Sequence, residues 1–351
     1  MAMKATDFAL SPGAYGIPNR EELVEHRIWD THYHGFMSGS RPGAIAQRQA
    51  TAYYVERMMT QHRAAMYYAE RMGIERVVAL DIAGGDAQWG DRPAPAPMQE
   101  EAEIIEQEQR KTLEKDRDRV SGIVRIHPSH PEKSCAKMEK WIRNGPCIGI
   151  KYSGGAGGVP CSHPNNDAIV SLARELNAVV YVHAWILVGG NPRTYLGGMK
   201  PGESTPMDVA ILAKRFPDMP IICGHSGGDW EVGARAVRPC ENVLFEFSGS
   251  DPHSGQVDYA VNELGADRIV WGGHGPSRSY ATELSKVFDS DLHPADRMKV
   301  LGGNYRRLVE KIFRKKGYAL KVSDQGVGVT LNGHDRRSCS GRSPVRGSGP
   351  P

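Results

Sequence analysis

Short apolar runs rich in valine and isoleucine recur along the chain, and they constrain its fold more than any other feature. Within each run the apolar residues follow one another, without the alternation of apolar and polar positions typical of a strand exposed on one face. Such runs indicate strands buried on both faces, as in a parallel sheet covered by helices. Eight can be counted, at residues 26–30, 76–82, 121–126, 148–152, 178–182, 220–223, 242–247 and 268–271.

Segments with helical periodicity separate these runs. One apolar stripe at helical spacing extends over residues 55–69 and another over residues 301–312,. Shorter helices are expected at 167–176 and 206–216, and Pro294 suits the first turn of the last helix,. No G-x-G-x-x-G follows the first run, which disfavours an open dinucleotide-binding sheet. The pattern therefore predicts an α/β protein with a single (β/α)8 TIM barrel.

The domain organisation follows from the same pattern. We expect an N-terminal extension at residues 1–25, the barrel at 26–316, and a polar, disordered tail at 317–351, where glycine, serine and arginine come to dominate,. Insertions at 84–97, 154–164 and 189–206 are expected to shape the mouth of the barrel,.

Charge and cysteine content restrict the partners. Lys and Arg number 44 against 41 Asp and Glu, a net charge of +3 that favours a small-molecule substrate over nucleic acid or a membrane,. The six cysteines show no C-x-x-C spacing, and no apolar run approaches the roughly 20 residues of a membrane-spanning helix,. We therefore expect a soluble, cytoplasmic protein.

The motif Asp30-Thr31-His32-Tyr33-His34 stands where the first strand is expected to end. Alternate residues of a strand point to the same side, so His32 and His34 can direct two imidazoles at one ion. The alternative is a pair of solvent-facing histidines in a loop.

Three more histidines end apolar runs. His183 ends the fifth run, His225 the sixth and His274 the eighth. The carboxyl ends of barrel strands form the face on which barrel enzymes build their sites, and imidazole is a frequent metal ligand. Their shared placement predicts a divalent metal centre at this face.

In this order of motifs, from about residue 28 to residue 308, the chain resembles the amidohydrolase superfamily. It is most similar to the amidohydrolase-related (family 2) branch, which includes decarboxylases of the aminocarboxymuconate-semialdehyde type. The resemblance implies that His32, His34 and His183 bind the metal. It also implies that His225 helps to activate a metal-bound water or to polarise the substrate.

One position departs from that family. Its members usually have an aspartate in a Gly-Ser-Asp-x-Pro turn after strand eight, whereas this chain has His274 within Gly272-Gly273-His274-Gly275-Pro276. An imidazole can still bind a metal or accept a proton, but it supplies no negative charge. Either His274 replaces the carboxylate in catalysis, or activity is weakened or lost.

Four further residues are candidates for substrate binding. Lys151 ends the fourth run and is expected to contact substrate or to support the metal ligands, with a carboxylated lysine that bridges two metals as the alternative,. His127 ends the third run, where it could equally be a supporting hydrogen-bonded group. Arg278 could bind a substrate carboxylate or cap a helix, and Trp185 could contact an aromatic ligand or only pack a loop.

These observations support three functional hypotheses. The first is a metal-dependent hydrolase that acts on a small carbonyl or carboxylate substrate, with zinc, or else manganese or iron. The second is a decarboxylase of the same branch, a C–C lyase. The third is a degenerate barrel that binds a ligand without turnover. Relatives often pair, so a homodimer is also expected.

Overall fold

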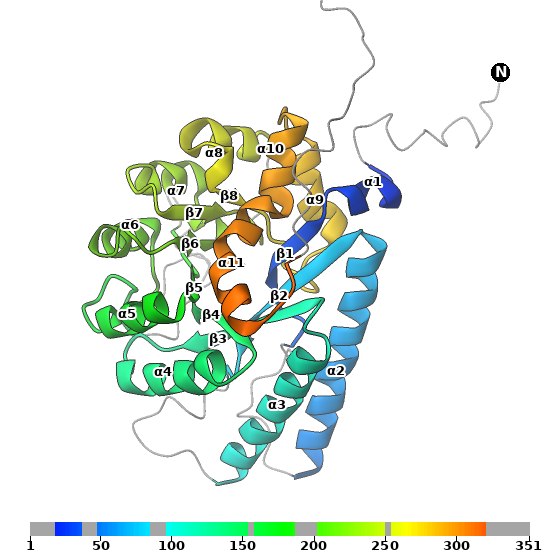
Figure 1. Ribbon diagram of the computed structural model, residues 1–351, viewed down its shortest axis with the longest axis vertical. Helices are drawn as coiled ribbons and strands as arrows, with labels where there is room; N and C mark the ends of the chain where they lie inside the picture. Colours follow the sequence, from blue (N-terminus) through cyan, green and yellow to red (C-terminus); the bar gives the residue numbers. More distant parts are fainter. Residues whose placement is uncertain are drawn as a thin grey trace, which may run out of the picture. The chain divides into compact units, whose positions relative to one another are not determined.

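The computed structural model describes residues 18–36, 48–84, 96–153, 158–186, 202–249 and 254–320. Eight parallel strands pair with one another in sequence order, as Figure 1 shows. Their bounds are β1 Ile28–Tyr33, β2 Ile74–Ile82, β3 Val120–Ile126, β4 Cys147–Tyr152, β5 Val179–Val182, β6 Ile221–Cys223, β7 Val243–Glu246 and β8 Ile269–Val270. The predicted (β/α)8 barrel is confirmed.

Helices alternate with the strands and cover the outside of the sheet (Figure 1). They are α1 Arg20–Glu25, α2 Arg48–Arg71, α3 Ala96–Lys115, α4 Pro131–Met138, α5 Asn166–Leu176, α6 Pro206–Arg215, α7 Trp230–Val237, α8 Gln256–Leu264, α9 Tyr280–Phe288, α10 Pro294–Met298 and α11 Asn304–Lys316. Short turns of 3-10 or π helix complete the set: η5 Glu139–Arg143, η6 Gly224–Gly227, η7 Ala266–Arg268 and η8 Lys299–Gly303. None of the helices in the described ranges is long and apolar enough to cross a membrane.

The sheet is nearly closed by hydrogen bonds between β1 and the segment after β8. The backbone N–H of Thr31 donates to the carbonyl of Trp271 over 3.4 Å, and that of His34 donates to Gly275 over 2.6 Å. Closure brings the carboxyl end of β1 beside the turn that contains His274, and this contact determines where the site forms.

Two elements differ from the sequence prediction. The first strand continues past residue 30 because its polar residues Asp30, Thr31 and His32 are all buried and hydrogen-bonded inside the barrel. The last helical segment does begin at Pro294, but the π turn η8 separates α10 from α11. The predicted insertions fall mainly outside the described residues, at 85–95, 154–157 and 187–201, as does the predicted tail from residue 321.

An aromatic cluster with a buried arginine fixes α11 against the amino ends of β1 and β2. The Arg76 guanidinium lies 5.0 Å from the ring centre of Trp29 and 5.2 Å from that of Phe313. Its N–H groups donate to Ser121 Oγ and to two backbone carbonyls. A buried charge is tolerated only when it is satisfied in this way, so the end of the barrel opposite the histidines serves stability.

Candidate active site

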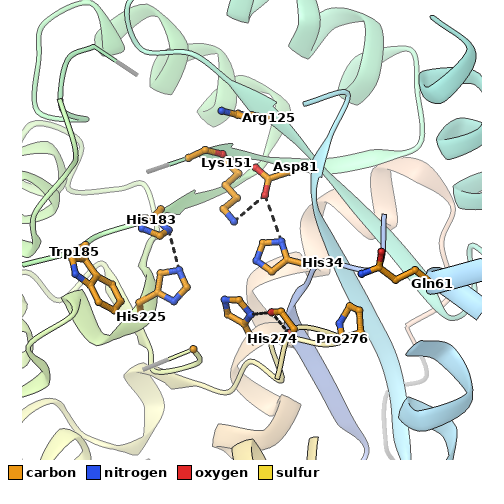
Figure 2. A pocket seen from close by; sticks show the side chains of 13 residues that line it. His34, Gln61, Asp81, Arg125, Lys151, His183, Trp185, His225, His274 and Pro276 are labelled. Atoms are coloured by element: carbon orange, nitrogen blue, oxygen red, sulfur yellow. Dashed lines mark hydrogen bonds and ion pairs between the residues drawn. The ribbon is translucent and has the colours of Figure 1, made fainter. Parts of the chain in front are cut away.

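Residues from the ends of all eight strands, or from the segments that follow them, meet at the carboxyl end of the barrel. They surround a cavity of about 560 Å³, which Figure 2 shows from close by. The described residues that line it are His34, Gln61, Asp81, Arg125, Lys151, Ser153, His183, Trp185, His225, Gly249, His274, Pro276 and Ser277. The prediction that four separated histidine segments converge on this face is therefore confirmed, with His32 buried beneath His34.

His32 and His34 approach each other through their Nε2 atoms, which lie 2.8 Å apart. The other ring nitrogen of His32, Nδ1, lies 2.6 Å from the Tyr181 hydroxyl and 3.3 Å from a carboxylate oxygen of Glu246. Because Tyr181 itself donates to Glu246, its hydroxyl oxygen accepts the Nδ1 proton of His32. The Nε2 atom of His32 is then left with a lone pair that points at His34.

A second pair is formed by His183 and His225. The Nδ1 atom of His225 donates to the Ser248 carbonyl over 2.8 Å, since a carbonyl can only accept,. Its Nε2 lone pair therefore faces His183 Nδ1, 2.9 Å away. On the outer side of His183, Nε2 lies 3.4 Å from a carboxylate oxygen of Glu203.

His274 is oriented by its own turn. The Ser277 hydroxyl donates to the His274 carbonyl over 2.9 Å, so its oxygen is free to accept the short hydrogen bond from His274 Nδ1. This arrangement also leaves the Nε2 lone pair of His274 available. The ring stacks on that of His32, with 4.4 Å between the ring centres.

These residues fit a divalent metal ion. Potential ligand atoms of His32, His34 and His274 all lie within 4.8 Å of one another, and a second such group consists of His32, His225 and Glu246. Burial, followed by neighbouring charges, lowers the pKa of His32, His34 and His225 well below the ordinary value, and it lowers that of His274 to about 3. Neutral imidazoles with facing lone pairs repel one another unless a proton or cation lies between them.

The expected ligand set and the observed arrangement differ in one member. His274 joins His32 and His34 in the compact group, whereas His183 lies against His225. All of these side chains except the deeper His32 line the same cavity.

Lys151 forms a buried ion pair that the sequence did not predict. Its Nζ lies 3.2 Å from Asp81, whose second carboxylate oxygen accepts from Ser153 Oγ over 2.5 Å. Burial raises the pKa of Asp81, but the charges of Lys151, His34 and Arg125 outweigh it and hold the pKa below its ordinary value. Asp81 also lies 3.6 Å from His34 Nδ1, so it connects the lysine to the histidine cluster.

Asp81, Arg125 and Glu246 were missed in the sequence. Asp81 and Glu246 stand near the ends of the second and seventh apolar runs, and Arg125 pairs in register with Lys151. A search for charged as well as imidazole side chains at the ends of the runs would have found them.

The backbone is strained at three site residues. Asp81, His225 and His274 have φ angles of 60°, 56° and 50°, in the left-handed region that non-glycine residues seldom occupy,. Such conformations cost about 1–3 kcal/mol each and persist where surrounding contacts enforce them. Here they aim the side chains into the cavity.

Of the three other residues predicted to bind substrate, one lines the cavity and two lie outside its lining. Trp185 lines the cavity, with its ring centre 5.9 Å from that of His225. His127 is half-buried outside the lining, where its Nδ1 accepts from the backbone of Ser129. Arg278 is exposed, donates to the Gly249 carbonyl over 3.1 Å, and lines a neighbouring cavity.

Taken together, the closed parallel barrel and the histidine cluster at its carboxyl face define the class of barrel metalloenzymes,. A family model described as Amidohydrolase matches residues 30–311, and the chain belongs to this family. The family assignment made from the histidine motifs is confirmed. No curated protein matches the chain in sequence.

Solved structures with the same fold include several decarboxylases. The 2,6-dihydroxybenzoate decarboxylase from Rhizobium is 18% identical with a TM-score of 0.60, and covers 81% of this chain and 98% of its own. The 5-carboxyvanillate decarboxylase from Sphingomonas paucimobilis is 15% identical with a TM-score of 0.58, over 81% and 99%. A dihydroxybenzoic acid decarboxylase from Polaromonas sp. JS666, with bound manganese and the inhibitor 2-nitroresorcinol, is 16% identical with a TM-score of 0.58, over 81% and 96%.

Proposed function

We propose that the chain is a metal-dependent lyase that removes a carboxylate group, as carbon dioxide, from a small aromatic or otherwise unsaturated acid. The observation on which the proposal rests is the charge of the cavity lining. Arg125 and Lys151 are cationic, and the single carboxylate among the described lining residues, Asp81, is already paired with Lys151. The lining alone has an excess of positive charge, which favours an anionic substrate.

The metal would be held by His32 and His34 together with His274 or His183. When bound, it would supply positive charge that polarises the oxygen atoms of a substrate. Zinc is our first expectation from the imidazole ligands, and manganese or iron would also suit them. Manganese is named with two of the decarboxylases that share this fold.

The reaction exchanges a carboxylate for a proton. The bond between the carboxylate carbon and the substrate breaks, its electron pair stays on the substrate, and one proton is added there as carbon dioxide leaves. Arg125 and Lys151 would attract and orient the acid, and Trp185 offers a ring for an aromatic substrate to contact,. The proton would be delivered by His225 or His274, since imidazole can take a proton from solvent and release it.

The described lining residues include no carboxylate other than the paired Asp81, which disfavours hydrolysis. In the family, the usual strand-eight aspartate accepts a proton, and this chain has His274 there. The observation that favours hydrolysis is the inward lone pair of His225 Nε2, which could accept a proton from water,. Hydrolysis of an ester, lactone or amide is therefore the second candidate.

Isotope labelling separates the two reactions. Protein loaded separately with zinc, manganese or iron would be offered hydroxybenzoates labelled with ¹³C in the carboxylate, in heavy water, and a panel of esters and lactones in H₂¹⁸O. We expect ¹³CO₂ together with deuterium on the carbon that lost the carboxylate. Incorporation of ¹⁸O into a product acid would select hydrolysis instead.

Two controls complete the design. Metal-stripped protein should be inactive, and Arg125→Gln should raise KM for the acid because it removes a cation from the lining,. If metal-loaded protein binds ligands from the panel but converts none of them, the lyase proposal fails and the binding-only hypothesis is favoured.

A further inference from the structure

A second cavity of about 510 Å³ adjoins the histidine cavity. The two share Gln61, Pro276 and Ser277 as lining residues, so a single molecule can contact both. Figure 2 shows Gln61 and Pro276 at one side of the histidine cavity, opposite Trp185. Ser277, which orients His274, therefore stands between the candidate reaction centre and the second cavity.

One wall of the second cavity is mainly apolar, and the other includes a cationic side chain. Helix α2 supplies Ala64, Ala65 and the ring of Tyr68, which is 57% exposed, and Met72 follows directly after the helix. The turn after β8 and the start of α9 supply the other wall, which includes Ser277, Ser279 and the cation Arg278. Arg278 makes one hydrogen bond, to the Gly249 carbonyl, and in the described ranges its other N–H groups have no partner.

We propose that this second cavity, lined by Ala64, Tyr68 and Arg278, is a distal subsite that binds the far end of an elongated substrate. The substrate would have an apolar middle that packs on α2 and a terminal carboxylate or similar anion that pairs with Arg278. A guanidinium can bind a carboxylate through two parallel hydrogen bonds, which selects anions of that shape. This inference rests on the proposed function, because it assumes that a carboxylate at the other end of the molecule occupies the histidine cavity.

The size of the cavity supports this assignment. Small-molecule sites commonly enclose about 300–1,000 Å³, so the second cavity is large enough to be a site by itself. A single-ring acid in the histidine cavity would leave it unfilled, whereas a longer acid would use both. Arg278 then determines specificity for substrate length and charge, while His225 and His274 serve the reaction in the neighbouring cavity.

The test compares ligands of increasing length. Metal-loaded protein is titrated calorimetrically with benzoate and with a series of benzoates that have a second carboxylate on a para alkyl chain of increasing length. We expect affinity to rise about tenfold or more at one chain length, relative to benzoate, from the added charge-assisted hydrogen bonds. Affinity that does not depend on chain length would overturn the proposal.

Two variants and a matched control locate the effect. Ala64→Phe adds bulk at an exposed position of the second cavity, and Arg278→Gln removes the cation. Each should reduce the ratio of long-chain to benzoate affinity by about tenfold. Arg57→Phe, at an exposed position of the same helix that lines neither cavity, should leave the ratio unchanged.

The possible outcomes separate failure of the distal subsite from failure of the proposed function. If benzoate binds and the ratio survives both variants, the distal subsite is wrong while the carboxylate-binding function stands. If the variants weaken benzoate as much as the long ligand, the second cavity is only a structural support, and the proposal fails. If no carboxylate of the series binds, the proposed function fails and the subsite fails with it.

Discussion

Glu246 is the side chain whose replacement tests the metal centre most directly. It is fully buried at the end of β7, and its oxygens accept from the Tyr181 hydroxyl and from the backbone N–H groups of His225 and Ser248. One of these oxygens also lies 3.3 Å from His32 Nδ1. A carboxylate behind a metal-binding imidazole fixes its tautomer and raises its basicity. The substitution Glu246→Gln keeps the size of the side chain and removes its charge.

The expected loss of stability in Glu246→Gln follows from the hydrogen bonds that the carboxylate accepts. Glu246 Oε1 accepts from Ser248 N over 2.6 Å, and Oε2 accepts from Tyr181 over 2.6 Å. An amide offers one oxygen and one NH₂ group, so one of these donors must face another donor. The unmade bond should cost about 1–3 kcal/mol of the free energy of unfolding. Loss of the orienting carboxylate should weaken metal binding by about 10- to 100-fold.

Metal affinity would be measured by competition with a chelator, and the free energy of unfolding by denaturant titration of the metal-free protein. Glu106→Gln is the control: Glu106 is 6% exposed on α3 and pairs with Lys140, outside the site. The control should alter stability without altering metal affinity. If Glu246→Gln binds metal as tightly as the wild type, the inference that Glu246 prepares His32 for a cation is refuted.

Three further changes test the site and its support. Gly249→Ala would place a Cβ 2.5 Å from His274 Cδ2 at a φ of 75°, so we expect the free energy of unfolding to fall by about 1–3 kcal/mol,. The control Gly265→Ala, with a φ of 81° and no atom within 4 Å of the added Cβ, should lower it less. Equal losses in the two variants would show that the contact with His274 is unimportant. His274→Asp restores a negative charge and should tighten metal binding about tenfold or more, and unchanged affinity and turnover would show that His274 does not belong to the site. Burial lowers the pKa of His62 from 6.5 to about 4, so between these pH values the unfolded chain binds a proton at His62 and the folded protein does not; up to about 3 kcal/mol of the free energy of unfolding should be lost as the pH falls from 6.5 to 4,. His62→Gln should reduce this dependence of the free energy of unfolding on pH, measured by denaturant titration at several pH values. An unchanged dependence in the variant would contradict the lowered pKa of His62.

The sequence was sufficient for the fold because each buried strand contains a short apolar run. It was also sufficient to place the histidines, since parallel strands of a closed barrel must end on one face. The extension of β1 to Tyr33 was missed, because polar residues end an apolar run in the sequence but can continue a strand when the barrel interior satisfies them.

The pairing of the histidines could not be derived from the sequence. The group of His274 with His32 and the contact of His183 with His225 depend on left-handed backbone at His225 and His274, which no side-chain pattern indicates. The second cavity was equally hidden, because α2 and the turn after β8 are about 200 residues apart in the chain and meet only when the barrel closes,.

The aspartate usual after strand eight in the family is His274 here, and a buried carboxylate elsewhere in the site can supply its charge. A site made only of imidazoles leaves a divalent ion without compensation, and the negative charge of Asp81 is already opposed by Lys151,. Glu246 is different, because its contacts are with neutral donors and His32, and no lysine or arginine pairs with it among the described residues. Glu246, next to His32, can therefore supply the negative charge that the family aspartate would supply at the mouth of the barrel. Since that carboxylate acts through an imidazole, it can stabilise a bound cation without adding to the one carboxylate, Asp81, among the described lining residues, so the lining keeps the excess of positive charge that an anionic substrate requires,.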